Sequence, residues 1–197
     1  GSHIDSVPDG GWLDGALGVM AALGVLRAWS SAGSPPPRDI VLIDFADEEG
    51  ARFGRSLFGS SAMAGHLDPA EVAGARDAAG TTIEEALAEN DLSLEGAARA
   101  HEDGLLDTLG AYLELHIEQG PALEAEGISC SAVSGCAGVE RHRLTFRGQA
   151  SHAGTTPMDL RRDAGLAAAE TALAVERVAR AHHGVGTTGT LDLEPGV

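Results

Sequence analysis

Apolar side chains recur at helical spacing in several segments of this 197-residue chain. Residues 14–29 show the pattern most clearly, and the Ser-, Gly- and Pro-rich stretch at 30–37 predicts where that helix ends. The same spacing predicts further helices at 57–66, 82–90, 94–101 and, with a long amphipathic face, at about 160–182.

Other segments have the patterns of strands. Residues 40–46 (IVLIDFA) form a nearly continuous apolar run, which is typical of a strand covered on both faces. Residues 111–117 (AYLELHI) are a second candidate. Residues 141–146 (RHRLTF) alternate polar and apolar side chains, and 186–193 (GTTGTLDL) also resembles a half-exposed strand.

The order of these elements predicts two domains. Strands alternating with helices indicate a layered α/β domain, which we place at residues 1–136. Residues 137–197 read as strand, long helix and strand, which predicts the first half of a separate α+β domain. Neither end of the sequence resembles a finished element, so we expect the chain to be a fragment of a longer protein.

Composition excludes several classes of function. The net charge is −17, with 30 acidic residues against 13 basic ones, and all 13 are arginine. The absence of lysine excludes a Schiff-base or P-loop lysine, and the negative charge argues against nucleic acid or an anionic membrane as partner. Cys130 and Cys136 are too few for a disulfide scaffold, so we expect free thiols in a reducing cytoplasm.

Two acidic segments contain candidate metal ligands. His3 and Asp5 lie two positions apart, so on an extended segment they face the same way, and Asp5 could hold the His3 ring in one tautomer. Asp14 is either another ligand or the cap of the helix that follows, and His3 is either native or part of a purification tag. Asp47-Glu48-Glu49 follows the first strand, where a metal would relieve the repulsion between carboxylates, unless this is a solvated acidic turn.

Two histidines complete the set of candidates. His116 ends the second predicted strand and is either structural or a nitrogen ligand at the same sheet edge. Histidine and carboxylate ligands together suit zinc, cobalt or manganese. His152, in the segment Ser151–Met158 (SHAGTTPM), is either a loop histidine or an oxyanion donor.

Four motifs together carry a family resemblance: GSHIDSVPDGG-WLDG, DEEGARFG, LHIEQGP and SHAGTTPMDLRRDA. The chain resembles the group of N-carbamoyl-L-amino-acid hydrolases, β-ureidopropionases and allantoate amidohydrolases. This group lies within the dinuclear zinc-peptidase-like superfamily of aminoacylases and carboxypeptidases. The likeness runs through the whole chain in order, and it indicates that His3 is native.

The resemblance implies a role for each motif residue. It implies a mixed-sheet α/β metallohydrolase catalytic domain at 1–136 and a lid or dimerisation domain beginning at 137. Two divalent ions (Zn, Mn or Co) would be held by His3, Asp14, Glu49 and His116, with Asp14 bridging them. Glu48 would be the general base, with Asp5 orienting His3, Gln119 near the substrate, and His152 reaching the partner subunit's site in a homodimer.

The resemblance also implies the reaction. We expect hydrolysis of a ureido C–N bond in an N-carbamoyl amino acid or related compound, with release of amine, carbon dioxide and ammonia. The family's last metal-binding histidine and its substrate-carboxylate ligands lie in a segment absent here, so these residues alone are expected to be inactive. The alternatives are an aminoacylase or dipeptidase using the same metals, and a non-catalytic dimerisation module.

Overall fold

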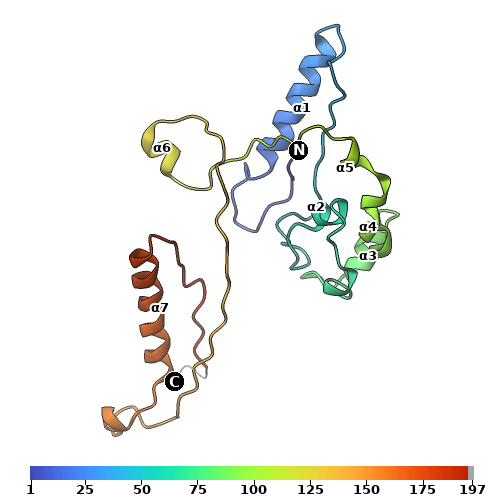
Figure 1. Ribbon diagram of the computed structural model, residues 1–197. Coiled ribbons are helices and arrows are strands. Elements are labelled where there is room, and N and C mark those ends of the chain that lie inside the picture. Colours follow the sequence, from blue (N-terminus) through green and yellow to red (C-terminus); the bar gives the residue numbers. More distant parts are fainter. Residues whose placement is uncertain (195–197) are drawn as a thin grey trace. The chain divides into compact units, whose positions relative to one another are not determined.

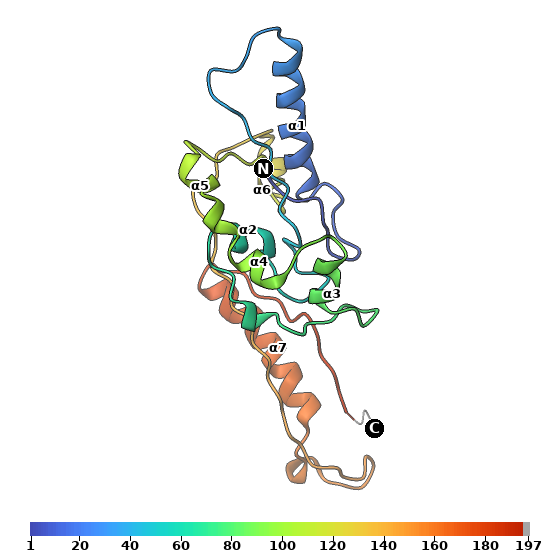
Figure 2. The same cartoon turned by 90° about the vertical axis from the view of Figure 1, so that its right-hand side faces the viewer.

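The computed structural model describes residues 1–194, and the chain divides into two compact units, residues 1–132 and 133–197. Figures 1 and 2 show a helix-rich chain. The helices of the first unit are α1 (Ala16–Ser31), α2 (Phe58–Met63), α3 (Ile83–Ala88), α4 (Leu94–Ala98), α5 (Leu105–Thr108) and α6 (Ala122–Glu126), with 3-10 turns at Pro69–Glu71 and Ala100–Asp103. No helix within the described residues is both long enough and apolar enough to cross a membrane.

The first unit has its core among short helices. Helices α2, α3 and α4 lie together in both views, while α1 extends away from them (Figures 1 and 2). Thr82 and Glu85 begin α3 with a capping box, in which each side chain accepts the other residue's backbone N–H. The core cluster of buried side chains consists of Phe58, Ala62, Leu67, Val72, Ile83 and Leu94.

The second unit contains η3 (Met158–Leu160) and α7 (Ala164–Ala181). Asp163 begins α7 by accepting the N–H of Leu166 at 3.0 Å, which satisfies one of the free amides of the first turn. Figure 1 shows extended segments running beside α7, and the backbone N–H of Gln149 donates to the carbonyl of Arg162 at 2.9 Å.

All five predicted helical segments are confirmed, four with shorter bounds and the first shifted by two residues. The 14–29 and 160–182 predictions became α1 and α7, while 57–66, 82–90 and 94–101 contain α2, α3 and α4. Helices α5 and α6 were not predicted. They span only four and five residues, too few to show a hydrophobic period.

None of the four predicted strands is present as a strand among the described residues. Residues 1–194 contain only isolated bridges, Ser2 to Asp44 in parallel and Arg76 to Thr82 antiparallel. Around the first bridge, Ser2 N–H donates to the Ile43 carbonyl at 3.2 Å and Phe45 N–H to the Ser2 carbonyl at 2.9 Å. A strand needs a continuous ladder to a neighbour. Among the described residues, the segments at 40–46 and 111–117 have from one to three backbone hydrogen bonds to other segments, and those at 141–146 and 186–193 have none, so the mixed sheet stays a prediction.

Candidate active site

The Ser2–Asp44 bridge brings the first two acidic motifs side by side. Through it, the segment carrying His3 runs beside the segment that leads into Asp47, Glu48 and Glu49. The third motif joins at the chain's start, where the Gly1 amino group donates to the Leu113 carbonyl at 3.0 Å. Ser2 Oγ donates to Glu114 Oε1 at 2.6 Å. Three segments far apart in sequence therefore meet around His3.

Helix α2 fixes the acidic turn from the other side. The N–H of Leu57 donates to the Glu48 carbonyl at 2.6 Å, and the N–H of Gly59 to the Ala46 carbonyl at 2.9 Å. A Cβ on Gly59 would lie 2.7 Å from the Ala46 nitrogen, so only glycine permits this approach. Hydrogen bonds from the first turn of a helix thus define the turn that carries Glu48.

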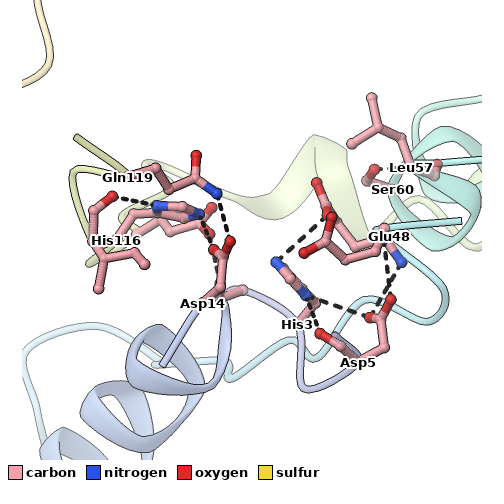
Figure 3. A network of polar contacts seen from close by, with 12 residues as sticks. His3, Asp5, Asp14, Glu48, Leu57, Ser60, His116 and Gln119 are labelled. Atoms are coloured by element: carbon pink, nitrogen blue, oxygen red, sulfur yellow. Dashed lines mark hydrogen bonds and ion pairs between the residues drawn. The ribbon is translucent and has the colours of Figure 1, made fainter. Parts of the chain in front are cut away.

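His3 is at the centre of the site and its ring is almost fully buried (Figure 3). Its Nδ1 lies 2.9 Å from the Asp5 carbonyl oxygen. A carbonyl only accepts, so Nδ1 carries a proton, and the neutral ring is the Nδ1–H tautomer. The other ring nitrogen, Nε2, lies 3.5 Å from Glu48 Oε2. A histidine in this tautomer is prepared to bind a metal through Nε2.

Asp5 plays a broader part than orienting the ring. Its carboxylate accepts the backbone N–H groups of Glu48 at 3.2 Å and Glu49 at 3.0 Å. The same carboxylate lies 3.4 Å from His3 Nδ1, farther than the Asp5 carbonyl does. Asp5 therefore ties the acidic turn to the His3 segment, and its backbone makes the shorter contact with the ring.

Asp14, His116 and Gln119 form the other half of the site (Figure 3). His116 Nδ1 lies 2.7 Å from the Ile117 carbonyl oxygen, so Nδ1 again carries a proton, and Nε2 lies 3.1 Å from Asp14 Oδ1. Gln119 Nε2 donates to Asp14 Oδ2. Helix α1 begins at Gly15 with no side-chain cap, so Asp14 is not a helix cap, and its carboxylate faces the site instead.

The donor set fits a cation. Asp14 Oδ1 is buried and lies 3.1 Å from His116 Nε2 without accepting a hydrogen bond from the described residues. A divalent cation between these two atoms would bind the carboxylate oxygen and the nitrogen of the neutral ring. Ligand atoms of His3, Asp14 and His116 lie within 4.8 Å of one another, and so do those of His3, Glu48 and Glu49. Because these two groups share His3, bridging by Asp14 stays a prediction.

Electrostatics in the site lead to the same conclusion. Burial raises the pKa of Glu48, and the charges of Glu49, Asp5 and Asp14 raise it further, although His3 opposes them. Burial lowers the pKa of His3, but its bond to the Asp5 carbonyl and the nearby carboxylates outweigh this effect and leave the pKa raised. The site therefore holds excess negative charge, which a divalent ion would compensate.

The sequence interpretation missed Gly15. A Cβ at this position would lie 2.5 Å from three atoms of the His3 ring, and its φ of +69° is in the left-handed region. Only a glycine leaves room for the ring with this backbone. Its place directly after Asp14 and before a helix was the available signal. His152 belongs to the second unit, so the structure leaves its predicted role in this site untested.

Comparison with known proteins identifies the family. The family model described as peptidase family M20/M25/M40 matches residues 1–194. The chain belongs to this family. This confirms the superfamily to which the four motifs pointed.

Relatives within the M20/M25/M40 family include ureido hydrolases. The chain is 43% identical over 197 residues to an N-carbamoyl-L-amino acid amidohydrolase of Geobacillus stearothermophilus, covering 100% of the chain and 47% of the relative. It is 42% identical over 184 residues to a probable allantoate deiminase of Oryza sativa subsp. japonica, covering 91% of the chain and 37% of the relative. Both names fall within the group that the motifs resemble.

A solved structure agrees with this assignment. A hydantoinase/carbamoylase family amidase from Burkholderia ambifaria matches with a TM-score of 0.67 and 32% identity, covering 100% of this chain and 47% of that one. The chain thus spans less than half the length of each of these three relatives.

Proposed function

We propose that the protein containing these residues is a metal-dependent amidohydrolase that cleaves the C–N bond of N-carbamoyl amino acids or related ureido compounds. The observation that carries the proposal is the gathering of candidate ligand atoms around the buried His3: those of His3, Asp14 and His116 lie within 4.8 Å of one another, with His116 Nε2 3.1 Å from Asp14 Oδ1. The 43% identity to an N-carbamoyl-L-amino acid amidohydrolase supports the choice of substrate.

The proposed division of labour follows the contacts. His3, Asp14, Glu49 and His116 would hold divalent ions such as zinc, manganese or cobalt, two of them if Asp14 bridges. When bound, these ions supply Lewis acidity and lower the pKa of water at the site. We further propose residues 1–136 as part of a mixed-sheet catalytic domain and 137–197 as the start of a lid and dimerisation domain.

Glu48 would carry the proton. Its backbone N–H is held by Asp5 and its carbonyl by Leu57, so the side chain is aimed from a fixed turn. Its raised pKa suits a group that takes a proton from water and returns it to the leaving nitrogen. The balanced reaction turns one N-carbamoyl group and one water into amine, carbon dioxide and ammonia. His152 would donate a hydrogen bond to the developing oxyanion from the partner subunit of a homodimer.

Gln119 has two proposed roles that differ in their effect. The resemblance suggests contact with the substrate, whereas its side-chain amide here donates to Asp14 Oδ2. A substrate role predicts a raised KM in Gln119→Ala with normal metal content. An Asp14-orienting role predicts weaker metal binding in the same variant.

The decisive experiment compares Glu48→Gln with Glu49→Gln. Metal content and ammonia release are measured on N-carbamoyl amino acids and allantoate, with N-acetyl amino acids and dipeptides as competitors. We expect Glu48→Gln to keep its metal and lose roughly 10²–10⁴-fold in kcat, the usual contribution of a general base. Glu49→Gln should lose metal, and the exposed Glu89→Gln should behave as the unmodified protein.

Three outcomes would contradict the proposal. Preferential turnover of N-acetyl amino acids or dipeptides would identify an aminoacylase or dipeptidase. A protein that binds no metal and turns over none of these compounds would be a non-catalytic dimerisation module. Full activity in Glu48→Gln would remove the proposed base while leaving the metal site standing.

A further inference from the structure

His152 is held in the opposite tautomer to the two histidines of the acidic site. Its Nδ1 accepts the backbone N–H of Gly154 at 3.0 Å and that of Thr155 at 3.2 Å. A backbone amide only donates, so Nδ1 carries no proton and the proton of the neutral ring is on Nε2. The His152 side chain is exposed, so this Nε2–H is open to a ligand.

The turn that fixes this tautomer is clamped by an arginine. Arg161 Nε donates to the Thr156 carbonyl at 2.9 Å, and its Nη2 donates to the Ala153 carbonyl. These two carbonyls flank the two amides that face His152. The N–H of Thr156 also donates to the His152 carbonyl at 3.2 Å, which closes the turn. A planar guanidinium that grips both sides of a turn restricts it more than a single point charge would.

We propose that Arg161 is a positioning residue for His152. By holding the carbonyls of Ala153 and Thr156, it aims the amides of Gly154 and Thr155 at Nδ1 and so presents His152 as an Nε2–H donor. The inference rests on the proposed function, in which His152 donates to the oxyanion. It makes His152 a hydrogen-bond donor that keeps its proton, while Glu48 alone moves protons.

Two tautomers thus separate two tasks. His3 and His116 donate from Nδ1 to a carbonyl, and each neutral ring then offers at Nε2 the lone pair that a metal ligand requires. His152 accepts at Nδ1 and keeps a proton on Nε2, as an oxyanion donor requires. A role of Arg161 in stability alone would not affect which nitrogen of His152 is protonated.

The test measures the ring nitrogens directly. The full protein is labelled with ¹⁵N-histidine, and His152→Gln identifies the His152 resonances. In the unmodified protein we expect Nδ1 to be unprotonated and Nε2 protonated. Arg161→Gln should shift both resonances toward a mixture of tautomers and lower kcat about tenfold or more with little change in KM, since an oxyanion contact acts in the transition state. Arg161→Lys should lie between.

Arg162→Gln is the matched control, because Arg162 is the exposed neighbour in the same segment. It should change neither the resonances nor kcat. A protonated Nδ1 in the unmodified protein would overturn the assignment. Unchanged resonances and unchanged kcat in Arg161→Gln would reduce Arg161 to a structural residue. If circular dichroism shows that Arg161→Gln is unfolded, the His152 resonances and the kcat of Arg161→Lys are used in its place to test the positioning role.

The test separates this inference from the proposed function. An Nε2–H tautomer that depends on Arg161, in a protein that hydrolyses no ureido compound, would refute the proposed function and leave the positioning role standing. If the protein hydrolyses ureido compounds but Arg161→Gln leaves the His152 tautomer unchanged, the proposed function stands and the positioning role is refuted.

Discussion

His3 is almost fully buried, and its ring lies against the backbone of Gly15 at the start of helix α1. Alanine at position 15 would place a methyl group 2.5 Å from three ring atoms and would impose a left-handed φ on a residue with a Cβ. The positive φ alone costs a residue with a Cβ roughly 1–2 kcal/mol. The ring must also move, so we expect Gly15→Ala to lose more free energy of metal binding than free energy of unfolding. Metal titration measures the first loss and thermal unfolding the second.

Gly24→Ala is a matched control within the same helix. No atom lies within 4 Å of a Cβ at this position, and its φ is not in the left-handed region. Removing a helical glycine stabilises by roughly 0.5–1 kcal/mol, so this variant should bind metal normally and unfold slightly later. Normal metal affinity in Gly15→Ala would show that His3 does not need its present position.

Asp77 organises a loop through charge and hydrogen bonds. Its carboxylate accepts from Arg52 Nε at 3.1 Å, Thr81 N–H at 2.9 Å and Ala79 N–H at 3.0 Å. Burial raises the pKa of Asp77, but these bonds outweigh it, and the folded-state pKa is lowered. A lowered pKa stabilises the fold above the unfolded-state pKa, and this contribution is lost as pH falls through the folded-state value.

The pH dependence of Asp77→Asn follows from that sign. At pH 7 the variant should speed hydrogen exchange of residues 76–82 relative to the unmodified protein. The difference should shrink as the pH falls through the lowered folded-state pKa of Asp77, where the unmodified carboxylate becomes protonated. The exposed Asp103→Asn should show no such effect. A difference independent of pH would mean that the carboxylate charge is not involved.

Among the elements, the short helices α2, α3 and α4 form the framework behind the acidic turn. Leu94 in α4 is 5% exposed and packs with Phe58 of α2, the helix whose first turn binds the carbonyls of Ala46 and Glu48. We expect Leu94→Ala to destabilise by about 2–4 kcal/mol. Leu92, two residues earlier, is 59% exposed, and Leu92→Ala should cost far less. Urea unfolding of both variants checks this, and equal losses would show that Leu94 is not a core residue.

Local patterns predicted the helices better than the strands. The helical period of α1 and α7 is contained in their own residues, and each forms by hydrogen bonds within itself. The segment at 40–46 depends on a neighbour, and among residues 1–194 only Ser2 forms a β-bridge with it. Its apolar side chains consequently remain partly open, with Val41 at 47% exposure. An apolar run forms a strand only where a neighbouring segment supplies backbone hydrogen bonds along its length.

The motif residues were predictable because each carries a ligand atom, and the structure gathers six of them. His3, Asp5, Asp14, Glu48, Glu49 and His116 lie in one region, although 113 positions separate His3 from His116. What the sequence could not supply were the contacts that define their positions. Gly15 and Arg161 carry no chemistry in the reaction, and their roles emerge only from the distances around His3 and His152.

For the whole molecule, the proposed homodimer makes a prediction about which subunit's His152 serves each site. If His152 acts on the partner's site, a mixed dimer of Glu48→Gln and His152→Ala subunits contains one site with an intact Glu48 and the other subunit's intact His152. If His152 acts within its own subunit, neither site of the mixed dimer is complete. The two arrangements therefore differ in whether two inactive variants restore activity when combined.

Random association makes about half of the dimers mixed, and one of two sites works in each, so co-expression should restore about a quarter of the normal ammonia release. Each variant expressed alone should remain inactive, and metal content should be normal in all samples because neither substitution removes a proposed ligand. Activity returns only if the two variant subunits assemble into one dimer, so they are co-expressed instead of being mixed as finished dimers. A different affinity tag on each variant isolates the mixed dimers. In that species half of the normal activity is expected. No activity in isolated mixed dimers would place His152 in the site of its own subunit.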